Sequence, residues 1–196
     1  ATVTNTYTND GDVATSDGPL SNTGPLGPDI TLFHYDDMRQ RTGIVGPDPD
    51  GGGSLHFRAL RYTYDGDGQV TQVERGWLAA QTDWGANFHT LEEVDTTYNA
   101  LAQTVQDAFA AGGTTYNVTQ YSYDNANRLQ CTAVRMNPAI FGSLPASACT
   151  LGTEGANGPD RISKNVYDQV NRVIQVISAL GATVNGVELQ QVTATQ

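Results

Sequence analysis

Aromatic residues recur along the chain in pairs spaced two apart, and turn-forming residues follow them. Tyr62 and Tyr64 form one such pair, and Tyr121 and Tyr123 form another. Residues two apart lie on the same face of a β-strand. The Asp-Gly-Asp-Gly at 65–68 suits a tight turn, and the β-rich residues of 70–74 follow it. Each unit therefore predicts a β-hairpin.

One phrase carries this pattern: Tyr-Asp, two variable residues, Gly or Asn, a polar residue and an aliphatic residue. Self-similarity of this kind marks a repeat architecture. We expect Tyr64, Tyr123 and Tyr167 to occupy equivalent stacked positions, one in each hairpin. Good copies of the phrase start at Tyr64, Tyr123 and Tyr167, and weaker copies start at Tyr7, Tyr35 and Tyr98.

The residues after each tyrosine are those that tight turns favour. Asp and Asn side chains can bond to their own backbone, and Gly and Asn tolerate a positive φ. We expect the aspartates to fix the turn that follows each tyrosine. In the good copies the turn residues are Asp65, Gly68, Asp124, Asn127, Asp168 and Asn171.

Residues 99–111 support two interpretations. Their Ala, Leu and Gln content predicts a helix that would stop at Gly112 and Gly113. The position of Tyr98 in the repeat instead predicts that this segment belongs to another hairpin. We favour the hairpin, because tertiary context often overrides helix propensity.

The repeated phrase resembles the tyrosine-aspartate repeat of RHS/YD-repeat proteins, whose usual form is Tyr-Asp-x-x-Gly-Arg-Leu/Val. The six copies span residues 7–176. The resemblance implies an all-β fold, in which consecutive antiparallel β-hairpins form a continuous, curved or spiralling sheet. We expect residues 1–196 to be one YD-repeat domain that belongs to a longer chain.

The same resemblance implies a function. In RHS/YD-repeat proteins such hairpins build a hollow shell that holds a toxic polypeptide. This chain would then be a non-enzymatic structural part of a shell around a toxin or other cargo, in a secreted or cell-surface protein of a bacterium. Its partners would be flanking repeats or other copies of itself, through sheet edges, and an encapsulated polypeptide.

Two other functions stay open. Sheet edges that lack a partner pair with other chains, so the protein would form an extracellular fibre if copies joined end to end. Alternatively, the rings of Trp77 and Trp84 would stack on sugars if they were exposed. The second alternative makes the chain a module that binds carbohydrate or a cell surface.

The charge of the chain argues against two classes of partner. Its formal net charge is −11, and its ten basic residues include a single lysine, Lys164. Nucleic-acid binding requires a basic face, and none is evident. We expect no membrane insertion either, because no apolar run is long enough to span a bilayer.

Recognisable catalytic chemistry is missing from the sequence. The three histidines, His34, His56 and His89, stand apart without metal-ligand spacing. The acidic turns at 48–51 and 65–68 raise the question of calcium, but they lack the further oxygen ligands of a calcium loop. We therefore interpret their aspartates as turn formers, and we expect no enzyme activity, cofactor or metal.

Cys131 and Cys149 lie 18 positions apart, which is unlike the spacing of a zinc site. The secreted location that the RHS/YD resemblance implies favours a disulfide between them. In a reducing compartment they would instead stay free thiols.

Overall fold

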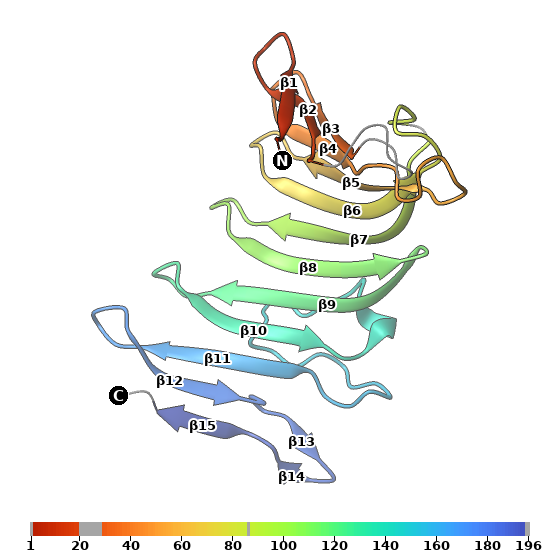
Figure 1. Ribbon diagram of the computed structural model, residues 1–196. Helices are drawn as coiled ribbons and strands as arrows, with labels where there is room; N and C mark the ends of the chain where they lie inside the picture. The colour runs from red at the N-terminus through yellow and green to blue at the C-terminus, as the bar shows by residue number, and fades with distance from the viewer. Residues whose placement is uncertain (1, 20–28, 86, 195–196) are drawn as a thin grey trace. The chain divides into compact units, whose positions relative to one another are not determined.

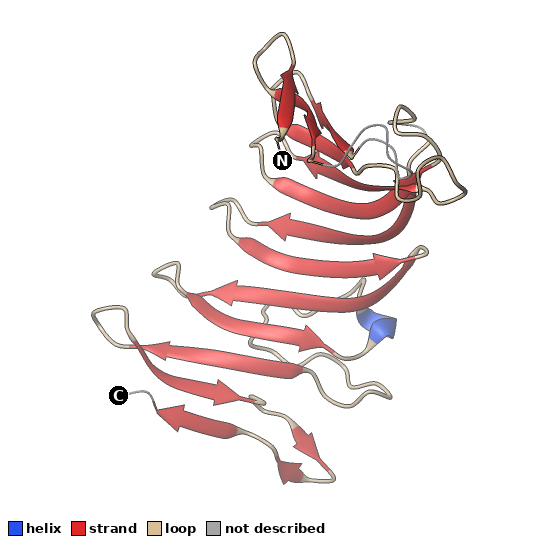
Figure 2. Ribbon diagram, viewed as in Figure 1, coloured by secondary structure: helices blue, strands red, loops and turns tan. Residues whose placement is uncertain are grey.

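A computed structural model describes residues 2–19, 29–85 and 87–194. Over these residues the chain is almost entirely β-structure, and its one helical segment is the short 3-10 turn η1 (Pro138–Ile140), drawn blue in Figure 2. The expected all-β fold is confirmed. None of the described residues belongs to a helix long and apolar enough to cross a membrane.

Within the part of the chain that the structure describes, thirteen strands form one sheet, and in the sheet order each strand lies beside the previous one (Figure 1). This order is that of consecutive antiparallel hairpins, as the repeat predicts. A separate two-stranded hairpin, β13–β14, stands between β12 and β15 in the chain. The strands are β1 (Thr4–Tyr7), β2 (Val13–Asp17), β3 (Ile30–Tyr35), β4 (Arg41–Val45), β5 (Phe57–Tyr64), β6 (Val70–Leu78), β7 (His89–Tyr98), β8 (Thr104–Ala111), β9 (Thr114–Tyr123), β10 (Leu129–Arg135), β11 (Arg161–Tyr167), β12 (Val173–Ser178), β13 (Thr183–Val184), β14 (Val187–Glu188) and β15 (Gln191–Ala194).

The segment with high helix propensity is a strand, which confirms the hairpin interpretation. Residues 104–111 form β8, and they pair antiparallel with β9. Gly112 and Gly113 have φ values of 56° and 76°, which is the conformation of a two-residue hairpin turn. The two glycines therefore reverse the chain between strands and do not end a helix.

The chain divides into two compact units, Ala1–Val94 and Asp95–Gln196. In the first unit Val45, Ala59 and Leu78 form a buried cluster on one face of the sheet. Trp84 and Phe88, from the connection between β6 and β7, pack against this cluster. Burial of these apolar side chains is the main favourable contribution to the stability of the unit.

The close packing of Trp84 depends on one glycine. A Cβ atom at Gly43 would lie only 2.0 Å from the Trp84 ring, so any larger residue at position 43 would push the ring away. The side chain of Gln81 fixes the same connection, because its Nε2 donates to the carbonyls of Ile30 at 2.6 Å and Gly46 at 2.8 Å.

In the second unit a long connection covers the sheet. Cys131, Ala133 and Ile162 point to one face of β10 and β11, and Ala148 from the connection between these strands completes the buried cluster. Ala133 pairs directly with Ile162 in the strand register. The connection, residues 136–160, is therefore part of the core of this unit.

Candidate functional site

The repeated tyrosines occupy equivalent positions. Each is the last residue of the first strand of its hairpin, in β1, β3, β5, β7, β9 and β11. The degenerate copies follow this rule as the good copies do. A five-residue turn then leads into the second strand, and in Figure 1 the turns that follow β9 and β11 lie at the same end of their strands. The tyrosines are Tyr7, Tyr35, Tyr64, Tyr98, Tyr123 and Tyr167.

The first residue of each turn holds the turn together through its side chain. Asp124 Oδ1 accepts hydrogen bonds from the backbone N–H groups of Ala126 at 2.9 Å and Arg128 at 3.0 Å. The N–H of Asp124 donates to the Arg128 carbonyl at 2.9 Å. An Asp or Asn oxygen makes the same pair of bonds in four other turns, at Asp36, Asp65, Asn99 and Asp168.

The fourth residue of each turn adopts a left-handed backbone. Glycine and asparagine tolerate this conformation best, which explains the Gly or Asn of the phrase. Arg39 and Ala102 adopt it too, so the geometry of the turn prevails over their own preference. The φ values are 87° at Gly11, 64° at Arg39, 80° at Gly68, 59° at Ala102, 60° at Asn127 and 67° at Asn171.

The hydroxyls of Tyr35, Tyr64, Tyr123 and Tyr167 each link a hairpin to the one before it. Tyr123 donates to the carbonyl of Thr104 at 2.8 Å, and Tyr167 donates to that of Leu129 at 2.7 Å. In both cases the acceptor is the first residue of the last strand of the preceding hairpin. Their rings are half-buried. The same bond joins Tyr35 to Val13 and Tyr64 to Arg41.

Side chains of the turns also bind the adjacent turns. Arg128 Nε donates to Asp124 Oδ2 at 2.8 Å, within its own turn. Its Nη1 reaches Asn171 Oδ1 at 2.9 Å, in the next turn, and its guanidinium lies 4.5 Å from the centre of the Tyr167 ring. Similar links join Arg39 to Asp12 and Gln103 to Asn127. We call this series of turns and cross-links the turn ladder.

The arginine that ends a turn also affects its aspartate. The hydrogen bond from the Arg128 side chain, together with backbone N–H groups, lowers the pKa of Asp124. The backbone N–H and side chain of Arg172 likewise lower the pKa of Asp168. Both carboxylates are therefore held in the charged form that accepts the turn hydrogen bonds.

In the acidic turns at 48–51 and 65–68 the carboxylates accept hydrogen bonds from backbone N–H groups. Asp48 accepts hydrogen bonds from the N–H groups of Asp50, Gly51 and Gly52, at 3.0, 3.0 and 2.8 Å. Asp65 accepts from its own turn in the same way. In the described part of the chain no three His, Cys, Asp or Glu residues gather as a metal site.

A polar cluster that the sequence did not reveal fixes the long connection of the second unit. The side chain of Arg135, at the end of β10, is 0% exposed. Its Nη1 donates to Asp160 Oδ2 at 2.6 Å and to the Thr150 carbonyl at 2.8 Å. The guanidinium also donates to Gln120 Oε1 and to the Ser147 carbonyl. These bonds compensate for the burial of a charge.

Asp160 completes this cluster. Burial opposes its ionisation, but N–H groups of Met136 and Gly152 and the Arg135 guanidinium all donate to it, and together they lower its pKa. Cys131 and Cys149 add a covalent link, because their sulfur atoms lie 2.08 Å apart in a disulfide. The connection is thus attached to β10 by an ion pair and a disulfide.

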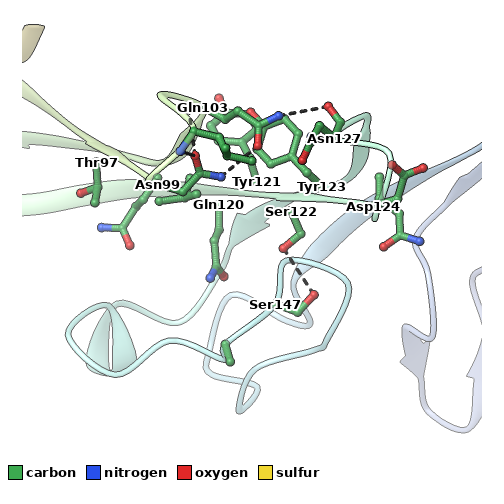
Figure 3. A pocket seen from close by; sticks show the side chains of 15 residues that line it. Thr97, Asn99, Gln103, Gln120, Tyr121, Ser122, Tyr123, Asp124, Asn127 and Ser147 are labelled. Atoms are coloured by element: carbon green, nitrogen blue, oxygen red, sulfur yellow. Dashed lines mark hydrogen bonds between the residues drawn. The ribbon is translucent and has the colours of Figure 1, made fainter. Parts of the chain in front are cut away.

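A polar cavity of about 590 Å³ lies beside this cluster, within the second unit (Figure 3). Ser147 bonds to Ser122 at its lower side, with the two hydroxyl oxygens 3.3 Å apart. Ser122 also accepts the N–H of Ala148 at 2.8 Å. The second unit contains no histidine, because all three precede residue 95. The lining includes Gln103, Gln106, Gln120, Tyr121, Ser122, Tyr123, Asp124, Asn127 and Ser147.

The histidines of the first unit stack on tryptophan. Trp77 lies between His56 and His89, with ring centres 3.8 and 3.9 Å apart. His34 lies against Trp84 at 4.3 Å. The sequence placed the histidines beside aromatic residues but did not reveal these pairs. Because rings cover both faces of Trp77, it offers no open surface for the sugar stacking considered above.

No protein-family model matches the chain, and no curated protein matches its sequence. Among solved structures, it is similar to a crystal structure of TcdB2-TccC3 without the hypervariable C-terminal region, at 14% identity and a TM-score of 0.48. A second crystal structure of TcdB2-TccC3 and the Photorhabdus luminescens Tc holotoxin pore with a mutated TccC3 each share 15% identity at the same TM-score. Each likeness covers 98% of this chain but only 12% of the other chain.

Proposed function

We propose that this chain is a non-enzymatic structural repeat region that forms part of the wall of a β-shell around a polypeptide cargo. The turn ladder is the observation that carries the proposal. Six hairpins repeat one turn geometry, and hydroxyl or side-chain bonds join successive hairpins on each unit. A wall needs such a design, because each hairpin must fix the position of the next one.

The division between constant and variable parts also supports a wall. The turns and strands keep one geometry, whereas the connections differ in length and carry their own local packing. A repeat whose units contact mainly their neighbours can be extended without redesign of a central core. The buried clusters that Trp84, Phe88 and residues 136–160 cover stiffen the sheet locally.

The chemistry of the polar groups fits a structural role. The repeated turn aspartates accept hydrogen bonds from backbone N–H groups, and the buried Arg135 and Asp160 form an ion pair with each other. The disulfide Cys131–Cys149 fits a secreted or cell-surface protein, because disulfides persist in oxidising compartments. The proposal therefore places the protein outside the cell or on its surface.

Electron cryomicroscopy of the product of the complete reading frame tests this function. We expect a closed β-wall with unassigned density inside it, and with the hairpins of residues 4–178 recognisable in the wall. A product in which these hairpins form an open surface that encloses nothing would contradict the proposal.

A second candidate is a self-assembling fibre, and the exposed outer strands favour it. All residues of β1 and β15 are exposed, and each of these strands has one neighbour in the sheet order. Such edges can pair with another copy. Val192→Pro removes a backbone donor from β15 and should shorten or abolish filaments if they form. Sedimentation of the wild-type protein as a monomer at all concentrations would exclude this candidate.

A further inference from the structure

The first unit has a second, open face. Ile44 pairs with Leu60, and Leu60 pairs with Arg75, across β4, β5 and β6. Residues that pair directly lie on the same face of a sheet. Their chain neighbours Val45, Ala59 and Gly76 point to the opposite face, where the buried cluster lies. The row of Ile44, Leu60 and Arg75 is therefore on the side away from that cluster.

This row forms part of a cavity of about 590 Å³. Ile44, Leu60 and Leu91 supply its apolar surface, and Leu91 is 56% exposed. Arg58 and Arg75 also line it. We call these five residues the leucine–arginine groove. It combines exposed aliphatic surface with two guanidinium groups, in a chain whose formal net charge is −11.

The two arginines differ in their surroundings. Arg75 forms an ion pair with Glu92 at 2.9 Å, although its side chain is 71% exposed. Arg58 is exposed and pairs in the strand register with Trp77. The groove thus already holds one carboxylate beside Arg75, which shows the chemistry that its charge favours.

An aromatic stack lies beside Arg58 in the sheet. Trp77 is held between His56 and His89, with both stacking distances below 4 Å. Arg58 lies opposite Trp77 on the adjacent strand, so the two side chains start from the same face of the sheet. A surface that is already ordered loses less entropy when a ligand binds.

We propose that the leucine–arginine groove binds an acidic, aliphatic polypeptide segment. Aliphatic side chains of the segment lie on Ile44, Leu60 and Leu91, and a carboxylate pairs with Arg58. This inference rests on the proposed function, because the occupant is a segment of the enclosed polypeptide. A phosphate backbone is a poorer fit, since the floor is apolar and Glu92 lies beside Arg75.

The test uses two fluorescent synthetic peptides, one of Glu and Leu and one in which Gln replaces every Glu. We expect the protein to bind the Glu peptide, and to bind the Gln peptide at least tenfold more weakly. Arg58→Gln should weaken binding of the Glu peptide about tenfold, and added salt should weaken it as well. Equal binding of the two peptides would overturn the proposal.

Two variants make opposite predictions. Glu92→Gln removes a competing carboxylate and frees Arg75, so it should strengthen binding of the Glu peptide several-fold. Leu91→Ser removes exposed aliphatic surface and should weaken it. Arg161→Gln, an exposed arginine of β11 in the other unit, is the matched control and should leave binding unchanged. If Arg161→Gln weakened binding as much as Arg58→Gln does, the effect would be one of general charge, and the proposed site would be wrong.

Decanoate distinguishes a polypeptide from a fatty acid as the occupant. If decanoate binds and the Glu peptide does not, the groove takes lipid carboxylates and the proposal is wrong. The microscopy described above separates this inference from the function. If microscopy shows a closed wall but the peptide does not bind, only the proposed peptide site is wrong. If the peptide binds but no closed wall is seen, the proposed shell function is wrong.

Discussion

The hydroxyl of Tyr167 donates a hydrogen bond to the carbonyl oxygen of Leu129, 2.7 Å away and 38 residues earlier in the chain. The bond joins two successive hairpins at the place where each turn begins or ends. Tyr123 makes the equivalent bond to Thr104. The repeated tyrosine is therefore a link between units, and its ring is half-buried on the sheet.

Tyr167→Phe removes this link and keeps the ring. We expect a loss of about 1 kcal/mol in the free energy of unfolding, which is typical for one hydrogen bond. Urea unfolding measures it. Tyr116→Phe is the control, because Tyr116 is 62% exposed, and it should have almost no effect. Equal effects of the two substitutions would show that the hydroxyl of Tyr167 contributes nothing specific.

Ala102→Gly should stabilise the protein. Ala102 has a φ of 59° at the fourth position of its turn, where an alanine is strained and a glycine is not. We expect a gain of about 0.5–1 kcal/mol after the entropy cost of glycine. Ala100→Gly, in the same turn, lies at a residue without positive φ and should give no gain. Thermal unfolding of both variants decides the question.

Arg135→Met should be strongly destabilising, because it leaves the buried Asp160 without its ion-pair partner. The expected loss is about 3–5 kcal/mol. Adding Asp160→Asn to the same chain should restore part of it. Arg172→Met removes an ion pair whose arginine is 77% exposed and should cost far less than Arg135→Met. Similar losses for Arg135→Met and Arg172→Met would refute the structural role of the buried cluster.

Removal of the disulfide by Cys131→Ala with Cys149→Ala should cost about 3 kcal/mol in the chain-entropy description. Denaturant unfolding with and without reductant measures the loss. Reductant should destabilise the wild type and leave the double variant unchanged. Non-reducing peptide mapping that finds two free thiols in secreted protein would contradict the expected bond.

Acid should weaken the packing around His34. Burial lowers the pKa of His34 below its ordinary value, so the folded protein holds this imidazole neutral where the unfolded chain protonates it. Stability from neutral His34 is therefore present above about pH 6.5 and is lost as the pH falls below that value. His34→Phe keeps a ring on Trp84 and should flatten the dependence of Tm on pH between about 7 and 5. Parallel Tm curves for the two proteins would disprove this coupling.

The repeated phrase was sufficient to predict the hairpins, because the residues that determine each turn are close together in the sequence. The strand before the turn, the aspartate that accepts N–H bonds and the residue with positive φ all lie within seven positions. The same register identified β8 correctly where helix propensity indicated otherwise. The exact turn at Ala102 was predictable only through its position in the repeat.

The buried clusters were not predictable, because their partners are distant in sequence. Arg135 meets Asp160 across a 25-residue separation, and Gln81 bonds to Ile30 from 51 positions away. Neither pair has a motif. One signal was available for Arg135: it ends the alternating strand Leu129–Arg135 at an inward position, where a charged residue requires a partner.

Protease protection in the product of the complete reading frame tests the central claim most directly. The native protein is digested with a nonspecific protease, and mass spectrometry identifies the surviving peptides. The same digestion is applied to a Val118→Pro variant, in which β9 is broken between its two neighbours. A wall that encloses a polypeptide predicts that segments outside the hairpins survive in the native protein and are digested in the variant. Equal digestion of those segments in both proteins, with the wild-type hairpins still intact, would contradict the account.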